Sequence, residues 1–396
     1  MKATLSSGIA WLYAGLIFFG LGSQALAVPG DFDESGRVDG KDLMVLSRAY
    51  GASNGDAAFD ATIDLNEDGT IDASDLAIFR NLFALSGRVQ SVFVANEYSH
   101  QVLRLSGSGR EMLSYTTNSS DVKVLGVDEE REWIWFSLQG TQGVRVIDFE
   151  GNIIKEIEGA NTPNDIFVNQ ENGYVWIKDV SRIYRVSPDV PDDYDVLLDS
   201  GYHQIITGVS SVSDIAVDNL SGAPVAWVVE RYSNSIYRIT PTGMPDNYDL
   251  DTESGYHTKV TFSGPQFLAV NQADHTIWVA STTEIKHLGS NGTSELGVVD
   301  SLSNIGGIAV NPVTGVCWYF DTSADMIVRL SETCVQEITF SPFVSNYIDV
   351  YAICVDPLTG EVFVADNGSD TIAKYSPNGT YLWDKGPYYY AYDLHC

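Results

Sequence analysis

Two kinds of hydrophobic pattern divide the chain near residue 90. Before that point, Leu43, Leu46 and Tyr50 recur at helical spacing, and a second set follows about 33 residues later at Leu76, Phe79 and Phe83. From Ser91 onward, short apolar runs alternate with polar turns, as in β-strands. The pattern therefore predicts a small helical domain followed by a large, mainly β domain.

The β region repeats one motif. An apolar run ends in Val followed by Asp or Asn, a turn follows, and the next strand carries Trp or Phe. The strand ends are Val127-Asp128, Val168-Asn169, Val217-Asp218, Val270-Asn271, Val310-Asn311 and Val355-Asp356. A third strand follows each motif, as in RIYRVSP and TIAKYSP, and many repeats continue through a glycine turn into a fourth. Four short strands at this period indicate a β-propeller.

The blade count depends on the two ends of this region. Val92–Ala95 resembles a second strand with no first strand before it, whereas Tyr388–Leu394 resembles a first strand with nothing after it. We expect the C-terminal strand to complete the blade that Ser91 begins, which makes seven blades and leaves no open edge. Six blades is the alternative if the C-terminal strand does not dock.

The helical region carries two twelve-residue loops rich in oxygen-bearing side chains, DFDESGRVDGKD from Asp31 and DLNEDGTIDASD from Asp64. Calcium takes six to eight oxygen ligands, which such loops supply from alternate residues and from one backbone carbonyl. We predict two structural calcium ions. The expected ligands are Asp31, Asp33, Ser35, Arg37 (carbonyl), Asp39 and Asp42 in the first loop, and Asp64, Asn66, Asp68, Thr70 (carbonyl), Asp72 and Asp75 in the second. Ser35 is neutral, so the first loop should bind more weakly.

Neither loop has a full helix before it, and each is followed by one. Two such loop–helix halves with Asp at the last loop position resemble a dockerin module, over roughly residues 30–87. The resemblance implies attachment to a cohesin-like module of another protein. Partner choice in that family is associated with loop positions 10 and 11, here Gly40-Lys41 and Ala73-Ser74, and these pairs differ. The repeats, as in IAVNPVTGVCWYF, resemble the NHL-type propellers, which include binding scaffolds, lactonases and lyases.

The N-terminal sequence has the features of a secretory signal peptide. Lys2 precedes an apolar run from Ile9 to Leu21, and Ala25-Leu26-Ala27 offers a small-residue cleavage site. The run is too short for a membrane span, so we expect an extracellular protein without membrane insertion. It would attach to a cell surface only through a partner. The predicted organisation is signal peptide 1–27, calcium-binding domain 28–87 and propeller 88–396.

Composition narrows the function classes. Asp and Glu number 53 against 22 Lys and Arg, for a net charge of −31, which argues against nucleic acid. Four cysteines lie near the C-terminus, and an exported chain permits disulfides. We predict the pairs Cys317–Cys334, at the ends of paired strands, and Cys354–Cys396, at the ends of neighbouring innermost strands if the ring closes.

No catalytic or cofactor-binding residue set is evident in the propeller. Trp135 and its equivalents are expected in the core, and His203 and His257 lie in two related insertions that we interpret as blade decoration. The favoured function is a docking protein whose propeller binds a protein or a glycan. The alternative is an extracellular lyase or hydrolase acting on polysaccharide or lactone, which would place the chain in polysaccharide catabolism. In a third interpretation the calcium domain acts only within the chain and stabilises the propeller.

Overall fold

The computed structural model describes residues 30, 32, 40–66, 68–85, 90–118, 120–139, 143–179, 181–219, 224–342 and 350–396. The predicted signal peptide lies outside these residues. Among the described residues, no helix is long and apolar enough to cross a membrane.

The N-terminal module contains two helices, α1 (Gly40–Ala49) and α2 (Ala73–Leu85). Their buried faces meet in a small core with the segment between them. The core residues are Leu46, Ala49, Ile63, Ile71 and Phe79. The predicted spacing of apolar residues at Leu46 and Phe79 thus places equivalent side chains of the two halves in one core.

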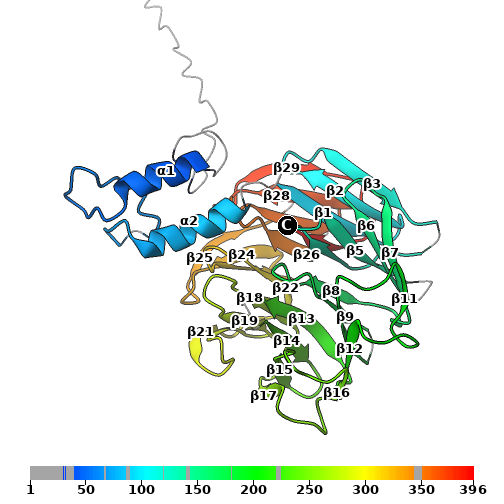
Figure 1. Cartoon of the computed structure of the whole chain (residues 1–396). Coiled ribbons are helices and arrows are strands. Elements are labelled where there is room, and N and C mark those ends of the chain that lie inside the picture. The colour runs from blue at the N-terminus through cyan, green and yellow to red at the C-terminus, as the bar shows by residue number, and fades with distance from the viewer. Residues whose placement is uncertain are drawn as a thin grey trace, which may run out of the picture.

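The rest of the chain forms a ring of seven sheets, so the seven-bladed propeller is confirmed and the six-bladed alternative is wrong (Figure 1). Each blade runs from an innermost to an outer strand. The first two blades along the ring contain β1 (Ser91–Asn96), β2 (Gln101–Ser106) and β3 (Glu111–Thr116), then β4 (Leu125–Asp128), β5 (Trp133–Leu138), β6 (Gly143–Asp148) and β7 (Ile153–Glu158). The third and fourth contain β8 (Asp165–Val168), β9 (Val175–Lys178), β10 (Ile183–Val186) and β12 (His203–Thr207), then β13 (Val212–Asp218), β14 (Val225–Glu230), β15 (Ser235–Ile239) and β17 (His257–Thr261).

The last three blades follow the same plan. They contain β18 (Phe267–Val270), β19 (Ile277–Ala280), β20 (Ile285–Leu288) and β21 (Glu295–Val299), then β22 (Ile305–Val310), β23 (Cys317–Asp321), β24 (Met326–Leu330) and β25 (Gln336–Phe340), then β26 (Val350–Val355), β27 (Val362–Asp366), β28 (Thr371–Tyr375) and β29 (Tyr381–Lys385). We call the end of the ring where the innermost strands begin the upper face, and the end where they finish the lower face.

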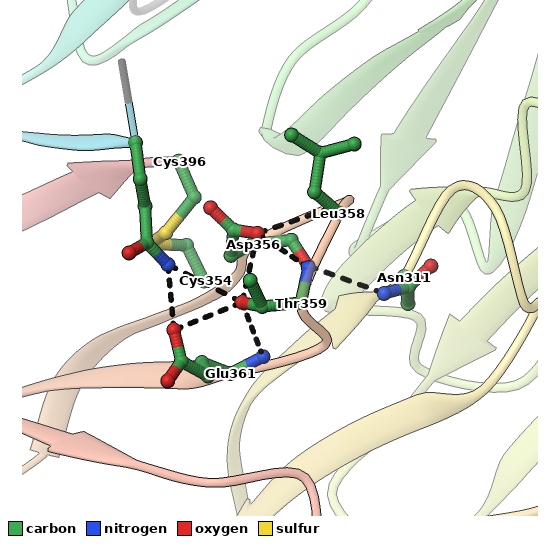
Figure 2. Close-up of a disulfide and its surroundings, with 8 residues drawn as sticks. Asn311, Cys354, Asp356, Leu358, Thr359, Glu361 and Cys396 are labelled. Carbon is green, nitrogen blue, oxygen red and sulfur yellow. Dashed lines mark hydrogen bonds between the residues drawn. A yellow bond between two sulfur atoms is a disulfide. The ribbon is translucent and has the colours of Figure 1, made fainter. Parts of the chain in front are cut away.

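The C-terminal strand closes the ring. β30 (Ala391–His395) pairs antiparallel with β1 and becomes the innermost strand of blade one. Just beyond it, Cys396 forms a disulfide with Cys354 on the innermost strand of blade seven (Figure 2). The described structure therefore contains this predicted pair.

The other predicted disulfide is wrong, because Cys317 and Cys334 are buried free thiols. The strand register pairs Cys317 with Leu330. Cys334 lies beyond that strand end, in the following turn, with a left-handed backbone φ of 61°. The two cysteines lie near the same end of the blade, but they are not opposite each other in the strand register.

Blade packing uses the aromatic residue of each second strand. Five tryptophans are at most 2% exposed, which confirms the predicted core role. They are Trp135, Trp176, Trp227, Trp278 and Trp318. Burial stabilises the fold by roughly 25 cal/mol per Å² of apolar area, so side chains of this size contribute much of the free energy of packing between neighbouring blades.

The two insertions add strands that the sequence pattern did not reveal. β11 (Asp193–Asp195) pairs in parallel with β7, and β16 (Asn247–Asp249) pairs in parallel with β12. Each added strand comes from the chain segment of one blade and pairs with the outermost strand of the preceding blade. Blades two and three therefore have five strands, and their outer edges are covered by the next blade along the chain.

Candidate functional site

The second predicted calcium loop is organised by two buried acids. Asp75, the last loop residue and part of the first turn of α2, accepts the backbone N–H groups of Leu65 at 2.7 Å and Asp72 at 2.8 Å. Asp64, the first loop residue, accepts the N–H of Gly69 at 2.8 Å. Asp64 and Asp75 are 7% and 0% exposed, so the loop is folded around its two end carboxylates.

The middle of this loop has an exposed acid, Asp68. Asp68 accepts bonds from the hydroxyl and N–H of Thr70, and these bonds lower the pKa of the Asp68 carboxyl below its ordinary value. Gly69 has φ of +87°, the left-handed conformation needed for the turn at position 6.

The donor set of this loop fits a hard cation, because every expected ligand is an oxygen and its backbone turn is formed. In this conformation the acid side chains bond mainly to backbone N–H groups. No three His, Cys, Asp or Glu side chains converge as a metal cluster among the residues that the structure describes. The composition and the turn geometry of the loop thus fit the predicted calcium ion.

The first loop is only partly described. Asp31, Asp33, Ser35, Arg37 and Asp39 lie outside the described residues. The remaining expected ligand, Asp42, is fully buried and accepts the N–H of Phe32 at 2.7 Å. This bond is the counterpart of the one between Asp75 and Leu65 in the second loop.

The upper mouth of the propeller channel carries polar and aromatic residues together with one lysine. At the start of each innermost strand, one residue occupies the same register position. These residues are Lys123, Asn164, Ser213, Gln266, Gly306, Tyr351 and Tyr392. The rings of Tyr351 and Tyr392 meet edge to face with centroids 4.6 Å apart, and the Lys123 ammonium lies 5.3 Å from the Tyr392 ring centre.

A row of tyrosines leads from this mouth to the rim. Tyr392 lies near-parallel to Tyr390, and Tyr390 to Tyr98, with centroids 5.9 and 5.8 Å apart. Tyr98 is 73% exposed. Tyr390 has φ of 57°, which is uncommon for a bulky residue, and its backbone is held by bonds to Glu97 and Asn367. The fold thus fixes an exposed aromatic row on the upper face.

Three aspartates occupy the next layer of the channel. Asp393, Asp165 and Asp214 each accept a backbone N–H from the innermost strand of the following blade, at Leu125, Ile215 and Leu268. Burial raises the pKa of all three carboxyls, that of Asp393 to about 7. Each side chain is partly exposed only to the channel, a cavity of about 550 Å³ with mainly apolar walls.

The histidines that the sequence singled out have local partners. His203 bonds through Nδ1 to the Tyr194 hydroxyl at 2.8 Å, and His257 to the Tyr248 hydroxyl at 2.9 Å. Each pair fastens an insertion to its own blade. His100 Nδ1 lies 2.7 Å from a carboxylate oxygen of Asp121 on the upper face.

Sequence reasoning missed the three channel aspartates and the tyrosine row. The aspartates had a visible signal, since NDI, SDI and YDL carry Asp at one register position of three innermost strands. The tyrosine row had no such signal in the sequence. Tyr98 lies nearly 300 residues from Tyr390 and Tyr392, and only ring closure brings them together.

We call the N-terminal module with its two predicted calcium loops the calcium module, and it lies against blades six and seven (Figure 1). Leu65 of the second loop and Ile78 of α2 belong to a cluster that includes Val313 and Leu358 of the propeller. A cavity of about 500 Å³ is lined by residues of both parts. The second half of the module therefore contacts the propeller directly.

Comparison with known proteins supports both parts. Residues 29–84 match the family model of the dockerin type I domain. Dockerin domains bind calcium and bind cohesin modules, and they occur in extracellular proteins. No curated protein is significantly similar to the chain.

Several solved structures share the propeller fold. A streptogramin B lyase is 18% identical, with a TM-score of 0.55, over 72% of this chain and 89% of its own. Virginiamycin B lyase from Staphylococcus aureus is 18% identical, with a TM-score of 0.52, over 73% and 89%. A putative 6-phosphogluconolactonase from Bacteroides fragilis is 10% identical, with a TM-score of 0.57, over 78% and 97%. At these identities the likeness establishes the fold alone, and the resemblance to NHL-type repeats stays a prediction.

Proposed function

We propose that this chain is an exported docking protein. Residues 28–87 hold two structural calcium ions and attach to a cohesin-like module, and the propeller of residues 88–396 presents its upper face to a protein or a glycan. A signal peptide of residues 1–27 would direct export. Docking then depends on calcium, because the metal fixes the loops from which both helices start.

The second loop carries the calcium part of this proposal. Its end acids, Asp64 and Asp75, are buried and already bonded to the loop backbone, so a cation would enter a nearly formed site. The full ligand set is proposed to be Asp64, Asn66, Asp68, the Thr70 carbonyl, Asp72 and Asp75, with the equivalent positions from Asp31 to Asp42 in the first loop. When bound, calcium supplies charge neutralisation for these acids and does no chemistry.

The upper mouth supports a binding role for the propeller. Neutral hydrogen-bonding groups such as Asn164 and Gln266 occupy the same register level as Tyr351 and Tyr392. Such groups and exposed tyrosine rings suit recognition of hydroxyl-rich or peptide surfaces. The wild-type chain should capture a partner from the source's secreted and surface proteins in calcium and release it in chelator. Recovery of no calcium-dependent partner would argue strongly against docking.

The proposed binding role of the propeller is tested in a separate experiment. Tyr98→Ala combined with Tyr390→Ala should abolish retention on the propeller's ligand without affecting calcium-dependent capture. Tyr381→Ala is the matched control, since Tyr381 is an exposed tyrosine on the outer strand β29. Equal loss in the control would exclude the tyrosine row as the contact surface.

An extracellular enzyme is the second candidate. Asp165, Asp214 and Asp393 gather in the channel with raised pKa values, and protonated carboxyls are the groups that general acid catalysis uses. The named lyases and the putative lactonase share this fold and do not transfer their reactions to it. Turnover of a polysaccharide or lactone that disappears in Asp214→Asn would favour the enzyme over the binding protein.

A further inference from the structure

Two neighbouring turns on the lower face form a matched apolar surface. Blade six carries Asn311-Pro312-Val313-Thr314-Gly315 between its first two strands, and blade seven carries Asp356-Pro357-Leu358-Thr359-Gly360 at the same place. We call the pair of side chains Val313 and Leu358 the seat. The corresponding residues of blades two, three and five are Glu130, Glu171 and Ala273, and blade four has Leu220, which lies outside the described residues.

The seat is rigid before anything contacts it. The buried Asn311 side chain accepts the N–H of Val313 at 2.8 Å, and the buried Asp356 side chain accepts the N–H of Leu358 at 3.0 Å. Asn311 also donates from Nδ2 to the Asp356 carbonyl at 3.2 Å, which ties the two turns together (Figure 2). Both seat residues are thus held at fixed positions at little further entropic cost.

The occupant of the seat is the second half of the calcium module. Leu65 and Ile78 share one apolar cluster with Val313 and Leu358 and line one cavity with them, and all four side chains are half-buried. Four residues, 86–89, separate α2 from Gln90, whose amide donates to Glu361 at 2.6 Å beside the blade-seven turn. A tether this short gives the contact an effective concentration in the millimolar range.

One calcium ligand positions both contacting residues. Asp75 accepts the N–H of Leu65, and it stands one helical turn before Ile78 on α2. Without a cation, Asp64, Asp68, Asp72 and Asp75 repel one another across the loop, and this repulsion opposes the geometry that brings Leu65 and Ile78 to the seat. A cation in the loop removes the repulsion.

We propose that the propeller carries a built docking surface for its own calcium module, and that calcium binding in the second loop and seating on Val313 and Leu358 are thermodynamically linked. The inference rests on the proposed ligands of the second loop. By reciprocity, seating raises the calcium affinity of this loop by the same factor by which calcium favours seating. The first loop and the exposed residues Leu43 and Met44 of α1 remain available to an external partner.

The test is a calcium titration of the full mature chain by calorimetry. Asp31→Ala and Asp33→Ala are introduced first, so that only the second loop titrates. Val313→Asn with Leu358→Asn should then raise the calcium dissociation constant by at least about fivefold, the lower end of usual coupling energies. The control is Val335→Asn with Leu198→Asn, which alters apolar residues that are 59% and 84% exposed, and it should leave the constant unchanged.

A second measurement separates seating from misfolding. In chelator, the seat variant and its parent should melt at the same temperature, because the module is then unseated in both. An unchanged dissociation constant in a variant that passes this check would overturn the linkage. Failure to capture a cohesin-like partner would contradict the docking function and would not affect the linkage between calcium binding and seating. A parent chain that binds no calcium would overturn both proposals.

Discussion

Cys396, the last residue of the chain, is bonded to Cys354 of blade seven, with the two Cα atoms 5.9 Å apart. The bond joins the innermost strands of the first and last blades at the lower face (Figure 2). It therefore fastens the end of the strand that completes blade one to the innermost strand of the neighbouring blade.

Removing this bond should loosen the ring. The closed loop spans 42 residues, for which the loss of unfolded-state entropy corresponds to about 4 kcal/mol. Cys354→Ser with Cys396→Ser should lower the free energy of unfolding by about 3–4 kcal/mol in urea titrations followed by tryptophan fluorescence. Cys317→Ser is the control, since that thiol is free, and an equal loss in the control would contradict this role.

Calcium should bind with a stoichiometry of two and stabilise the module. At calcium one hundredfold above the dissociation constant, the gain is about 2.7 kcal/mol per site. Asp75→Ala should reduce the stoichiometry to one in calorimetry, because it removes a ligand and the acceptor for Leu65 and Asp72. Asp60→Ala changes an exposed acid outside both loops and should retain two ions.

The channel aspartates should make stability fall as pH rises. Burial raises the pKa of Asp393 to about 7 from an ordinary 3.8, so the folded state holds a proton that the unfolded state releases. Its stabilising contribution is complete below about pH 4 and is lost as pH rises to 7.

Asp393→Asn isolates this effect, since the amide oxygen still accepts the Leu125 N–H. The variant should match the parent near pH 4 and exceed its unfolding free energy near pH 8 by an amount on the order of a few kcal/mol. Asp165 and Asp214 titrate in the same direction in both proteins, so the difference between the two pH profiles is the measurement. Superimposable profiles would show that the pKa of Asp393 is not raised in the folded state.

Blade packing predicts unequal costs for two glycines with positive φ. A Cβ at Gly292 would lie 2.8 Å from the buried Trp227 ring, whereas a Cβ at Gly201 would meet nothing within 4 Å. Gly201→Ala should cost about 1 kcal/mol of backbone strain. Gly292→Ala should cost a further 1–3 kcal/mol from overpacking, measured by the same urea titration. Equal costs would mean that Trp227 moves aside freely.

The sequence predicted the features that repeat. Seven second-strand patterns and an unmatched C-terminal strand were enough for blade number and closure, because each blade must bury a similar apolar strand. Cys354–Cys396 followed from closure, while Cys317–Cys334 failed because strand ends that lie near each other need not be in register.

What the sequence did not reveal depends on contacts between blades. The strand Asp193–Asp195 is short and polar, and only the free edge of β7 makes it a strand. Val313 and Leu358 each look like an ordinary turn residue until the ring sets them side by side. In both cases the determining partner lies in a different blade.

Closure by β30 also bears on the order of synthesis. The first blade emerges early but lacks its innermost strand until β30 is made. Its exposed β1 edge must stay unpaired through the synthesis of the other six blades, which is a period of risk for wrong strand pairing. A chain that lacks β30 would therefore keep an unpaired β1 edge, so the docking of this one strand is the step that closes the ring.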